Sequence, residues 1–314
     1  MISVAVIGAG VNSLRHLQAI DSNPKTKLCA VADIIAEKAY AAAAPYGAAH
    51  YTDYLKMLNA EQPDAVIVNL PHYLHESCAI SCAQHGAHVL LEKPMSISAE
   101  SCHRICKAFQ QAGRLLQIGH VQRYMRENRA AKALIDSGTL GEIVFVEDTR
   151  VTNYFTAARP RWFFQKAQAG GGISLNFGAH SLDKLCYLTD SKIDSLVGHC
   201  TYACADADVD GSAQMYVKMR NGVSATISLC GYTVTPRNET MIYLTRGALR
   251  LRTGQDLWIS LNGKDERLST DEYPDPFAAQ WDDFIESISL GKQIACTGDY
   301  GMHIVEKISS VWTK

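Results

Sequence analysis

The stretch MISVAVIGAGVNSLRHLQAI, residues 1–20, decides the fold of the first part of the chain. Residues 2–7 are apolar and rich in β-branched side chains, which predicts a short buried strand. Residues 8–13 read GAGVNS and predict a tight glycine turn. Apolar residues then recur at 14, 17 and 20, a spacing that predicts a helix with one apolar face. The order strand, glycine turn, helix is typical of a parallel α/β unit.

The glycine turn, together with the acid that ends the next strand-like run at residues 27–33, indicates dinucleotide binding. Gly8 would permit the tight turn, and Gly10 would let the backbone approach a pyrophosphate at the amino end of the helix. Asp33 would accept hydrogen bonds from the adenosine ribose. Ser13 replaces the third glycine of the usual pattern and is still small enough to keep helix and strand close. The expected cofactor contacts in this region are Gly8, Gly10, Val11, Asn12, Ser13 and Asp33.

The residues at the end of the second strand favour NAD over NADP as the cofactor. The carboxylate of Asp33 would repel the 2′-phosphate of NADP. The next residues, Ile34 and Ile35, offer neither a cation nor a hydroxyl group to hold that phosphate. The alternative for the whole segment is a glycine turn that binds no ligand.

Strand-like runs alternate with helical runs up to about residue 120. This alternation predicts a doubly wound parallel sheet covered by helices on both faces, a Rossmann domain over residues 1–120. Ligands bind such sheets beyond the carboxyl ends of the strands. Residues 70–75 and 92–94 follow predicted strands and are therefore expected at that edge. They supply the further cofactor candidates Leu70, Pro71, His75, Glu92 and Lys93.

Beyond residue 120, a helical segment is followed by strand-like runs that are joined by turn pairs such as Asn221-Gly222. This pattern predicts an α+β domain over residues 121–314, built on a large, mostly antiparallel open sheet. The closing helical runs, 277–290 and 300–311, could pack back on the first domain. We therefore expect an α/β protein with two domains.

Composition limits the function classes. The 314 residues carry a formal net charge of −2, which gives no sign of a nucleic-acid or membrane partner. No apolar run is long enough to span a bilayer, and the first residues lack the basic start of a signal peptide, so we expect a cytoplasmic protein. The ten cysteines form no CxxC pair, so we expect neither disulfides nor a metal site.

Five segments resemble the Gfo/Idh/MocA oxidoreductase family, named for glucose–fructose oxidoreductase and inositol dehydrogenase. They are GAGVNSLRH at 8–16, PDAVIVNLPHYLH at 63–75, HVLLEKPMS at 88–96, IGHVQRY at 118–124 and GGGISLNFGAHSLD at 170–183. The EKP triplet and the last segment are the most specific. The resemblance implies a Rossmann domain, a substrate domain on an open sheet, a tightly bound nicotinamide cofactor, and homodimers or homotetramers formed through that sheet.

The resemblance also implies catalytic residues. Lys93 matches the family's catalytic lysine and would stabilise the alkoxide that forms from a secondary alcohol or relay its proton. His180 matches the family's histidine and would act as general base. Asn176 stands where the family often has aspartate, so it could orient the substrate or the imidazole but could not stabilise an imidazolium by charge. Asp183 could partly supply that charge.

Other side chains are weaker candidates. Those for substrate contact are Arg123, Tyr154, Trp162 and Asp183. Arg123 would hold a substrate oxygen or cap the following helix, and the two aromatic rings would stack on a sugar or belong to the core. His75 would line the nicotinamide pocket, and His16 would pack or form a hydrogen bond near the pyrophosphate turn. For Lys93 the alternative is an ion pair with Glu92 at the sheet edge.

These residues favour an NAD-dependent dehydrogenase that acts on a hydroxyl group of a sugar, cyclitol or other polyol, or glycoside. Two alternatives remain open at this stage. Redox-assisted cleavage of a glycoside would use tightly bound NAD and release no net NADH. A non-catalytic sensor would use the same fold to bind a nucleotide or a sugar.

Overall fold

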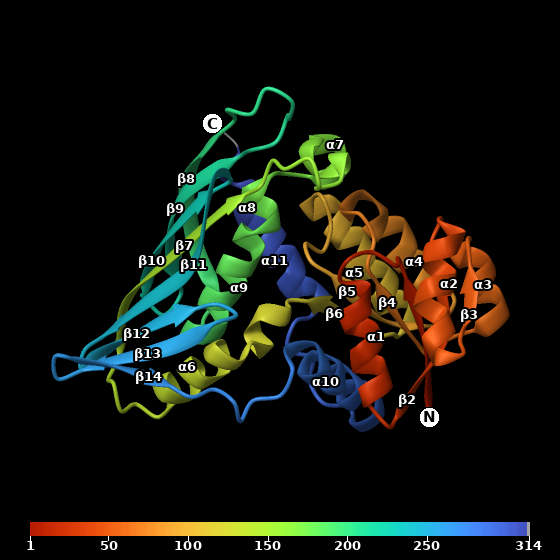
Figure 1. The fold of residues 1–314 in the computed structure, drawn as a ribbon, viewed down its shortest axis with the longest axis horizontal. Coiled ribbons are helices and arrows are strands. Elements are labelled where there is room, and N and C mark those ends of the chain that lie inside the picture. The colour runs from red at the N-terminus through yellow and green to blue at the C-terminus, as the bar shows by residue number, and fades with distance from the viewer. Residues whose placement is uncertain (313–314) are drawn as a thin grey trace. The chain divides into compact units, whose positions relative to one another are not determined.

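The computed structural model describes residues 1–312, with residues 233 and 234 described through their backbone only. The chain divides into two compact units, each with its own sheet (Figure 1). Unit 1 contains Met1–Gly119 and Phe277–His303. Unit 2 contains His120–Pro276 and the residues from Ile304 onward. In the part of the chain that is described, no helix is long and apolar enough to cross a membrane.

Unit 1 is built on a six-stranded parallel sheet with the order β3-β2-β1-β4-β5-β6. Its strands are β1 (Ile2–Ile7), β2 (Thr26–Ala32), β3 (Ala49–Tyr51), β4 (Ala65–Val68), β5 (His88–Glu92) and β6 (Leu116–Gly119). All of β4 is buried, as expected for a central strand that is covered on both faces. The direction of strand addition reverses between β1 and β4, so the ligand site of such a sheet lies beyond the ends of these two strands.

The helices of unit 1 begin in different ways, some with a capping side chain and others without one. They are α1 (Ser13–Ser22), α2 (Ala36–Ala43), α3 (Tyr54–Glu61), α4 (His75–Gln84), α5 (Ala99–Ala112) and α10 (Pro276–Leu290). The Asp53 side chain accepts hydrogen bonds from the first N–H groups of α3, and Ser98 does the same for α5. Gly113 ends α5 in the left-handed conformation. The last helix, α11 (Gly298–Ser309), contains the boundary between the two units.

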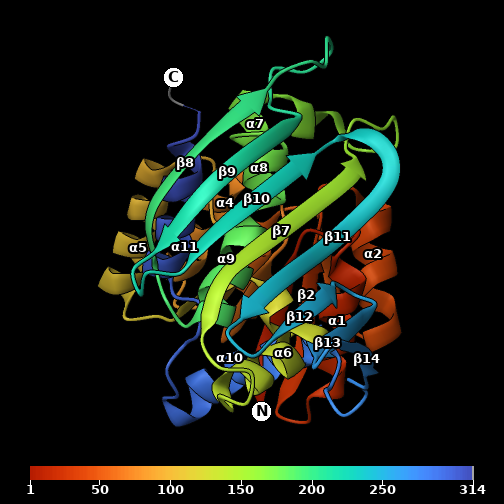
Figure 2. The same ribbon diagram turned by 90° about the vertical axis from the view of Figure 1, so that its left-hand side faces the viewer.

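Unit 2 is built on an eight-stranded sheet with the order β14-β13-β12-β11-β7-β10-β9-β8. Its strands are β7 (Ile143–Asn153), β8 (Ile193–Thr201), β9 (Ser212–Met219), β10 (Ser224–Cys230), β11 (Tyr232–Leu244), β12 (Gly247–Arg252), β13 (Asp256–Leu261) and β14 (Lys264–Leu268). Only the pair β7–β10 is parallel among these described strands. Figure 2 shows the open face of this sheet toward the viewer.

The other face of the unit 2 sheet is covered by helices. They are α6 (Arg126–Asp136), α8 (Ile173–Asn176) and α9 (Gly178–Thr189), and Figure 2 shows α8 and α9 behind the strands. The short helix α7 (Lys166–Ala169) packs instead on the turn at Arg161–Phe164. Ala213, Met215 and Val217 on β9 are buried, whereas the residues between them are exposed. This alternation is the signature of a sheet with one covered and one open face.

The expected fold class is confirmed, with a parallel Rossmann sheet and a larger, mostly antiparallel sheet. Two strands are missing from the sequence expectation, namely β3 and β14. The three-residue β3 is too short to show a pattern, and β14 is polar and mostly exposed. The first half of β11 was also not expected. Its polar residues Arg237, Asn238 and Glu239 pair with β7 through their backbone, and such residues give no apolar pattern in the sequence.

Candidate active site

The loop between β1 and α1 holds two glycines with different surroundings. Gly8 has a φ of +96°, and a Cβ on it would lie 2.2 Å from the backbone oxygen of Asn69 at the end of β4. Only glycine fits there. A Cβ on Gly10 would meet nothing nearer than the Asn69 Nδ2 at 3.8 Å. The protein itself therefore requires Gly8, whereas Gly10 leaves open space where a pyrophosphate would approach.

The amino end of α1 follows directly. Ser13 donates from its Oγ to the Gly10 oxygen at 2.6 Å and is itself 5% exposed. Its small side chain thus fits where the usual pattern has glycine. Val11 is 98% exposed, and the Asn12 side chain forms no capping hydrogen bond to the helix. Because no side chain caps this end, the first N–H groups of α1 and the positive end of its dipole fit an anionic group such as a pyrophosphate.

Asp33 follows β2 and is fixed on both sides by backbone. Its Oδ2 accepts a hydrogen bond from the Ala9 nitrogen at 2.8 Å, and its Oδ1 accepts one from the Ile35 nitrogen at 2.9 Å. Each carboxylate oxygen has further lone pairs that can accept hydrogen bonds from a ribose. The next residue, Ile34, is 89% exposed. The carboxylate is therefore held beside the glycine turn, as a ribose contact requires.

The segment after β4 contains Leu70, Pro71 and His75. His75 has no exposed surface. Its Nε2 lies 2.8 Å from the Leu70 oxygen and its Nδ1 lies 3.0 Å from the Pro94 oxygen. Burial lowers the pKa of His75, while the carbonyl oxygens around it act in the opposite direction. The ring thus joins the loops after β4 and β5, and the expectation that His75 lines the nicotinamide pocket stays a prediction.

The EKP triplet ends β5, and its glutamate is not a surface partner of Lys93. Glu92 is 6% exposed, and its Oε1 lies 2.9 Å from the Nε2 of His16 on α1. A carboxylate only accepts, so Nε2 must be the donor. The Glu92 Oε2 accepts a hydrogen bond from the backbone nitrogen of Lys93 at 3.1 Å. The Lys93–Pro94 bond is cis. Glu92 thus fixes the backbone of the triplet and has little surface left to offer a cofactor.

Burial alone would raise the pKa of Glu92, but His16 and Lys93 together hold it below its ordinary value. The carboxylate is therefore ionised at neutral pH. His16 also packs edge-on against the ring of Phe277, with the ring centroids 5.0 Å apart. The pair of His16 and Glu92 therefore links α1, the helix after the glycine turn, to the end of β5.

In unit 2, Asn176 and His180 stand on two successive helices rather than on one. Asn176 ends α8, Phe177 follows, and His180 lies in the first turn of α9. The two side chains are 7% and 9% exposed, respectively. The break at Phe177 was not expected, because the apolar spacing is continuous across it.

The glycine segment before α8 is tightly packed, although its composition suggested flexibility. The Asp210 carboxylate accepts hydrogen bonds from the nitrogens of Gly172 and Ser174, both at 2.8 Å. A Cβ on Gly172 would lie 1.9 Å from the Asp210 backbone oxygen, and one on Gly171 would lie 2.4 Å from the Trp312 ring. Asp210 and Trp312 therefore fix the start of the segment that carries Asn176.

Two of the weaker candidates pair with each other. Arg123 donates to the Oδ1 of Asp183 from its Nε at 3.0 Å and from its Nη2 at 2.6 Å. Asp183 has no exposed surface. One oxygen of Asp183 thus pairs with Arg123, and the expectation that Asp183 partly supplies the missing charge to His180 stays a prediction.

Buried charges also hold α9 against the sheet. The Lys184 Nζ lies 2.8 Å from the Asp148 Oδ1, and each side chain is 1% exposed. Ser181 donates to the other oxygen of Asp148 at 2.5 Å. Burial lowers the pKa of Lys184 to about 8. These contacts fix the helix that carries His180 to β7.

The aromatic candidates differ in their access. Tyr154 has no exposed surface. Its ring packs edge-on against Phe155 and Phe177 at 5.3 and 5.9 Å, and the guanidinium of Arg159 lies 4.2 Å above it. The ring is therefore covered in this structure, and the expectation that Tyr154 stacks on a sugar stays a prediction. Trp162 is half-buried and stacks on the neighbouring phenylalanine, so its expected role as a substrate contact stays a prediction.

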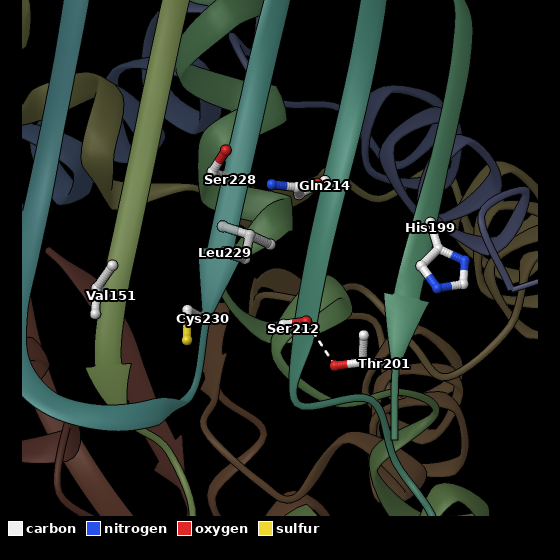
Figure 3. Close-up of a pocket in the computed structure, with 8 residues that line it drawn as sticks. All are labelled: Val151, His199, Thr201, Ser212, Gln214, Ser228, Leu229 and Cys230. Atoms are coloured by element: carbon white, nitrogen blue, oxygen red, sulfur yellow. Dashed lines mark hydrogen bonds between the residues drawn. The ribbon is translucent and has the colours of Figure 1, made fainter. Parts of the chain in front are cut away.

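A pocket of about 280 Å³ lies on the open face of the unit 2 sheet (Figure 3). His199, Gln214 and Ser228 project into it from β8, β9 and β10. It is lined by none of the expected site residues. The helix that carries His180 packs on the opposite face, where Gly178 meets the sheet. We therefore do not assign chemistry to this pocket.

Three residues that position or accompany the site escaped the sequence reasoning: His16, Asp210 and Arg159. His16 was expected to pack or form a hydrogen bond near the glycine turn, but its partner was not foreseen, because no local pattern joins it to a glutamate 76 positions later. Asp210 lies in a loop after β8 and meets Gly172 only in the folded chain. Arg159 did carry a signal, because it stands between two aromatic clusters in the sequence YFTAARPRWFF at 154–164.

Two relatives of this chain are named as dehydrogenases. It is 27% identical over 241 residues to the 1-carboxy-3-chloro-3,4-dihydroxycyclohexa-1,5-diene dehydrogenase of Comamonas testosteroni, covering 76% of this chain and 60% of that one. It is 31% identical over 196 residues to the D-glucoside 3-dehydrogenase of Escherichia coli, covering 59% and 53%. The matched region thus spans little more than half the length of these relatives.

The solved structures confirm the fold. The aldose-aldose oxidoreductase of Caulobacter crescentus, solved with glycerol, superposes with a TM-score of 0.90 at 24% identity, covering 99% of this chain and 96% of that one. Residues 2–120 match the oxidoreductase family with an NAD-binding Rossmann fold, and residues 128–250 match the GFO/IDH/MocA C-terminal domain. These two matches cover both units of the structure. The resemblance seen in the sequence is confirmed, and the chain belongs to the Gfo/Idh/MocA oxidoreductase family.

Proposed function

We propose that this protein is an NAD-dependent dehydrogenase that oxidises a secondary alcohol of a sugar, cyclitol or glycoside. The observation that carries the proposal is the loop after β1. There the protein requires glycine at Gly8 but leaves open space at Gly10, beside an uncapped helix end. Such a loop suits a pyrophosphate. In this proposal unit 1 binds the cofactor and unit 2 binds the substrate.

NAD is the cofactor that suits Asp33 better. Its carboxylate is fixed by two backbone N–H groups, so it cannot easily turn away from a phosphate that it repels. The exposed neighbours Ile34 and Ile35 provide no positive charge. Binding of NAD at least tenfold tighter than NADP, measured by calorimetry, would support this preference, and equal binding would contradict it.

Bound NAD would supply the acceptor for the hydride. The residues of the chain would handle the oxygen and its proton. Lys93 would place its ammonium beside the alcohol oxygen and stabilise the developing alkoxide. His180 would accept the hydroxyl proton. Asn176 would orient the alcohol or the imidazole through its amide, and since it carries no charge, the imidazolium gains no carboxylate at this position.

The test is a substrate screen with purified protein, NAD and matched sugars, inositols and glycosides, followed by NADH absorbance. Lys93→Ala should lower turnover at least about a hundredfold. The control is Lys107→Ala, an exposed lysine on α5, which should keep normal turnover. Normal turnover in Lys93→Ala would contradict the role of that lysine.

The same screen separates the other two functions. Cleavage of aryl glycosides without net NADH would replace dehydrogenation by redox-assisted cleavage. Cofactor binding without turnover of any compound would indicate a sensor.

We also propose that copies of the chain associate through the open face of the unit 2 sheet. This face exposes large side chains on the last two strands of the sheet, Tyr216 on β9 at 51% and Val197 on β8 at 64%. Light scattering should give a multiple of the 34.4 kDa chain mass, and Tyr216→Asp should lower it. A monomeric wild-type protein would contradict this assembly.

A further inference from the structure

We propose that the alcohol taken by unit 2 carries a carboxylate group, and that Arg159 binds this group. The inference rests on the proposed function and narrows its substrate to acidic sugars or acidic polyols. It starts from the Arg159 cluster, which we define as Arg159 with the rings of Tyr154, Phe163 and Phe177. The guanidinium carbon lies 4.2, 4.9 and 5.9 Å from the three ring centroids, respectively.

Arg159 is a half-buried cation to which the protein gives no counter-charge. Among residues 1–312, no carboxylate lies within ion-pair distance of its guanidinium. Burial lowers the pKa of Arg159, and the nearby Tyr154 only partly opposes this. Removing a charge from water is unfavourable unless a partner compensates. The ring faces offer some compensation, but they leave the N–H donors of the guanidinium without the oxygens they would bind.

Two other arginines of unit 2 with little exposed surface each have an acidic partner. Arg123 is paired with Asp183 through two hydrogen bonds. Arg150 faces Asp148 at 3.5 Å and donates to Gln122. Within the same unit, therefore, the sequence supplies an acid to buried guanidiniums that serve the core. In the described part of the chain Arg159 lacks one, as does the half-buried Arg129 over Tyr273. Of these two, only Arg159 lies over Tyr154 and Phe177, the neighbours of Asn176, so a ligand oriented by Asn176 would bring the acid to Arg159.

The position of the cluster connects it to the proposed substrate group. Tyr154 lies under the guanidinium. Burial raises the pKa of Tyr154 to about 12, and the side-chain amide of Asn176 is close enough to oppose part of that rise. Phe177, also under the guanidinium, directly follows Asn176 in the chain. Tyr154 and Phe177 therefore both lie under the Arg159 guanidinium and are both neighbours of Asn176. A molecule whose hydroxyl is oriented by Asn176 could place a carboxylate, a few bonds away, on Arg159.

A carboxylate suits the cluster better than a phosphate does. The planar guanidinium matches a carboxylate with two parallel hydrogen bonds. One positive charge balances one carboxylate, whereas a phosphate monoester carries nearly two charges. The other members of the cluster are neutral rings, and the buried Asp210 raises the pKa of Tyr154 by its negative charge. A second negative charge on the ligand would therefore be unfavourable.

The test uses matched compounds and two measurements on the NAD-loaded protein. The acids are D-glucuronate, D-galacturonate and D-gluconate. Each is compared with its methyl ester or neutral parent sugar and with the corresponding sugar 6-phosphate. NADH formation measures turnover, and calorimetry measures binding whether or not turnover occurs. At least one acid should bind, or turn over at low concentration, at least about tenfold better than its neutral and phosphate counterparts.

Three variants connect the preference to the residue. Arg159→Met should remove the preference for the acid and leave binding of the neutral compound within about twofold. Arg159→Lys should keep part of the preference, since it keeps the charge but loses the planar fork. The matched control is Arg129→Met, because Arg129 is also half-buried over a ring, that of Tyr273 at 5.1 Å. It should keep the full preference.

The outcomes separate this inference from the proposed function. Turnover of neutral sugars with no acid preferred, or an acid preference that survives Arg159→Met, overturns the carboxylate site while the dehydrogenase stands. If no compound yields NADH, but acids bind selectively and Arg159→Met abolishes that binding, the dehydrogenase is overturned and the carboxylate site stands. A preference for the 6-phosphates overturns the choice of carboxylate. Failure of every acid to bind better than its neutral counterpart overturns the inference outright.

Discussion

The two proposed catalytic segments of this protein are fixed in opposite ways. In unit 1, the EKP triplet is held by imidazole side chains, with His16 bonded to Glu92 and His75 bonded to the Pro94 oxygen. In unit 2, the segment before Asn176 is held at glycine backbone by the carboxylate of Asp210. The first arrangement depends on imidazole side chains, whereas the second also requires glycine, because the Gly172 backbone lies close to the Asp210 backbone. The comparison implies that the segment before Asn176 should tolerate change less well than the EKP triplet.

The largest effect should follow Gly172→Ala. Its new Cβ would lie 1.9 Å from the Asp210 backbone oxygen, and backbone cannot move away as the end of a flexible side chain can. The free energy of unfolding should fall by about 3 to 4 kcal/mol. Urea denaturation checks this, with the wild-type protein as reference. A loss below about 1 kcal/mol would show that the segment can shift, and the contrast between the units would then fail.

A smaller loss is expected for the acid itself. Asp210→Ala leaves two buried N–H groups without acceptors and should cost about 3 kcal/mol. Asp210→Asn keeps one acceptor and should cost about 1 to 2 kcal/mol. If the hydrogen bonds of Asp210 position Asn176, Asp210→Asn should also lower turnover at saturating substrate more than it lowers the affinity for NAD. Equal stability of the two variants would mean that the hydrogen bonds do not hold the segment.

The contrast also explains what the sequence could predict. The site elements of unit 1 follow strands whose apolar runs are visible, so the amino-acid sequence alone places Gly8, Asp33 and Lys93 at the carboxyl edge of a sheet. The glycine turn, the acid and the triplet are all local patterns. The closing helices were expected at 277–290 and 300–311, and α10 and α11 begin and end within two residues of those positions.

The support of the unit 2 segment could not be predicted in the same way. Gly172 and Asp210 are 38 positions apart, and nothing in either neighbourhood indicates that they meet. The same holds for Asp183, which looked available to His180 by helical spacing but is paired with Arg123 across 60 positions. Spacing along a helix gives the neighbours within that helix, whereas a buried charge is directed by whatever the fold brings to it.

A moderate, pH-dependent effect is expected in unit 1 from Glu92→Gln. The folded-state pKa of Glu92 lies below its ordinary value. The ionised carboxylate therefore adds stability above the unfolded pKa, and this stability is lost as the pH falls through the folded pKa. At about pH 7 the variant should be about 1 to 2 kcal/mol less stable than wild type, and the difference should shrink toward about pH 4. A difference that is constant across this range would mean that the charge of Glu92 does not contribute.

The smallest effect on stability, and the most informative one about ligands, is expected from Gly10→Ala. The new Cβ meets nothing nearer than 3.8 Å, so the free energy of unfolding should change by less than about 0.5 kcal/mol. Affinity for NAD, measured by calorimetry, should nevertheless fall at least about tenfold, because the methyl group occupies space that a pyrophosphate would need.

Gly8→Ala is the matched comparison for that experiment. It places a Cβ 2.2 Å from a backbone oxygen at a φ of +96°, so it should lose stability as well as affinity. The two neighbouring glycines would then separate what the fold requires from what the cofactor requires. If Gly10→Ala bound NAD normally, the open space beside Gly10 would not be the pyrophosphate site. The cofactor assignment would then lose its main support, even though the fold would be unchanged.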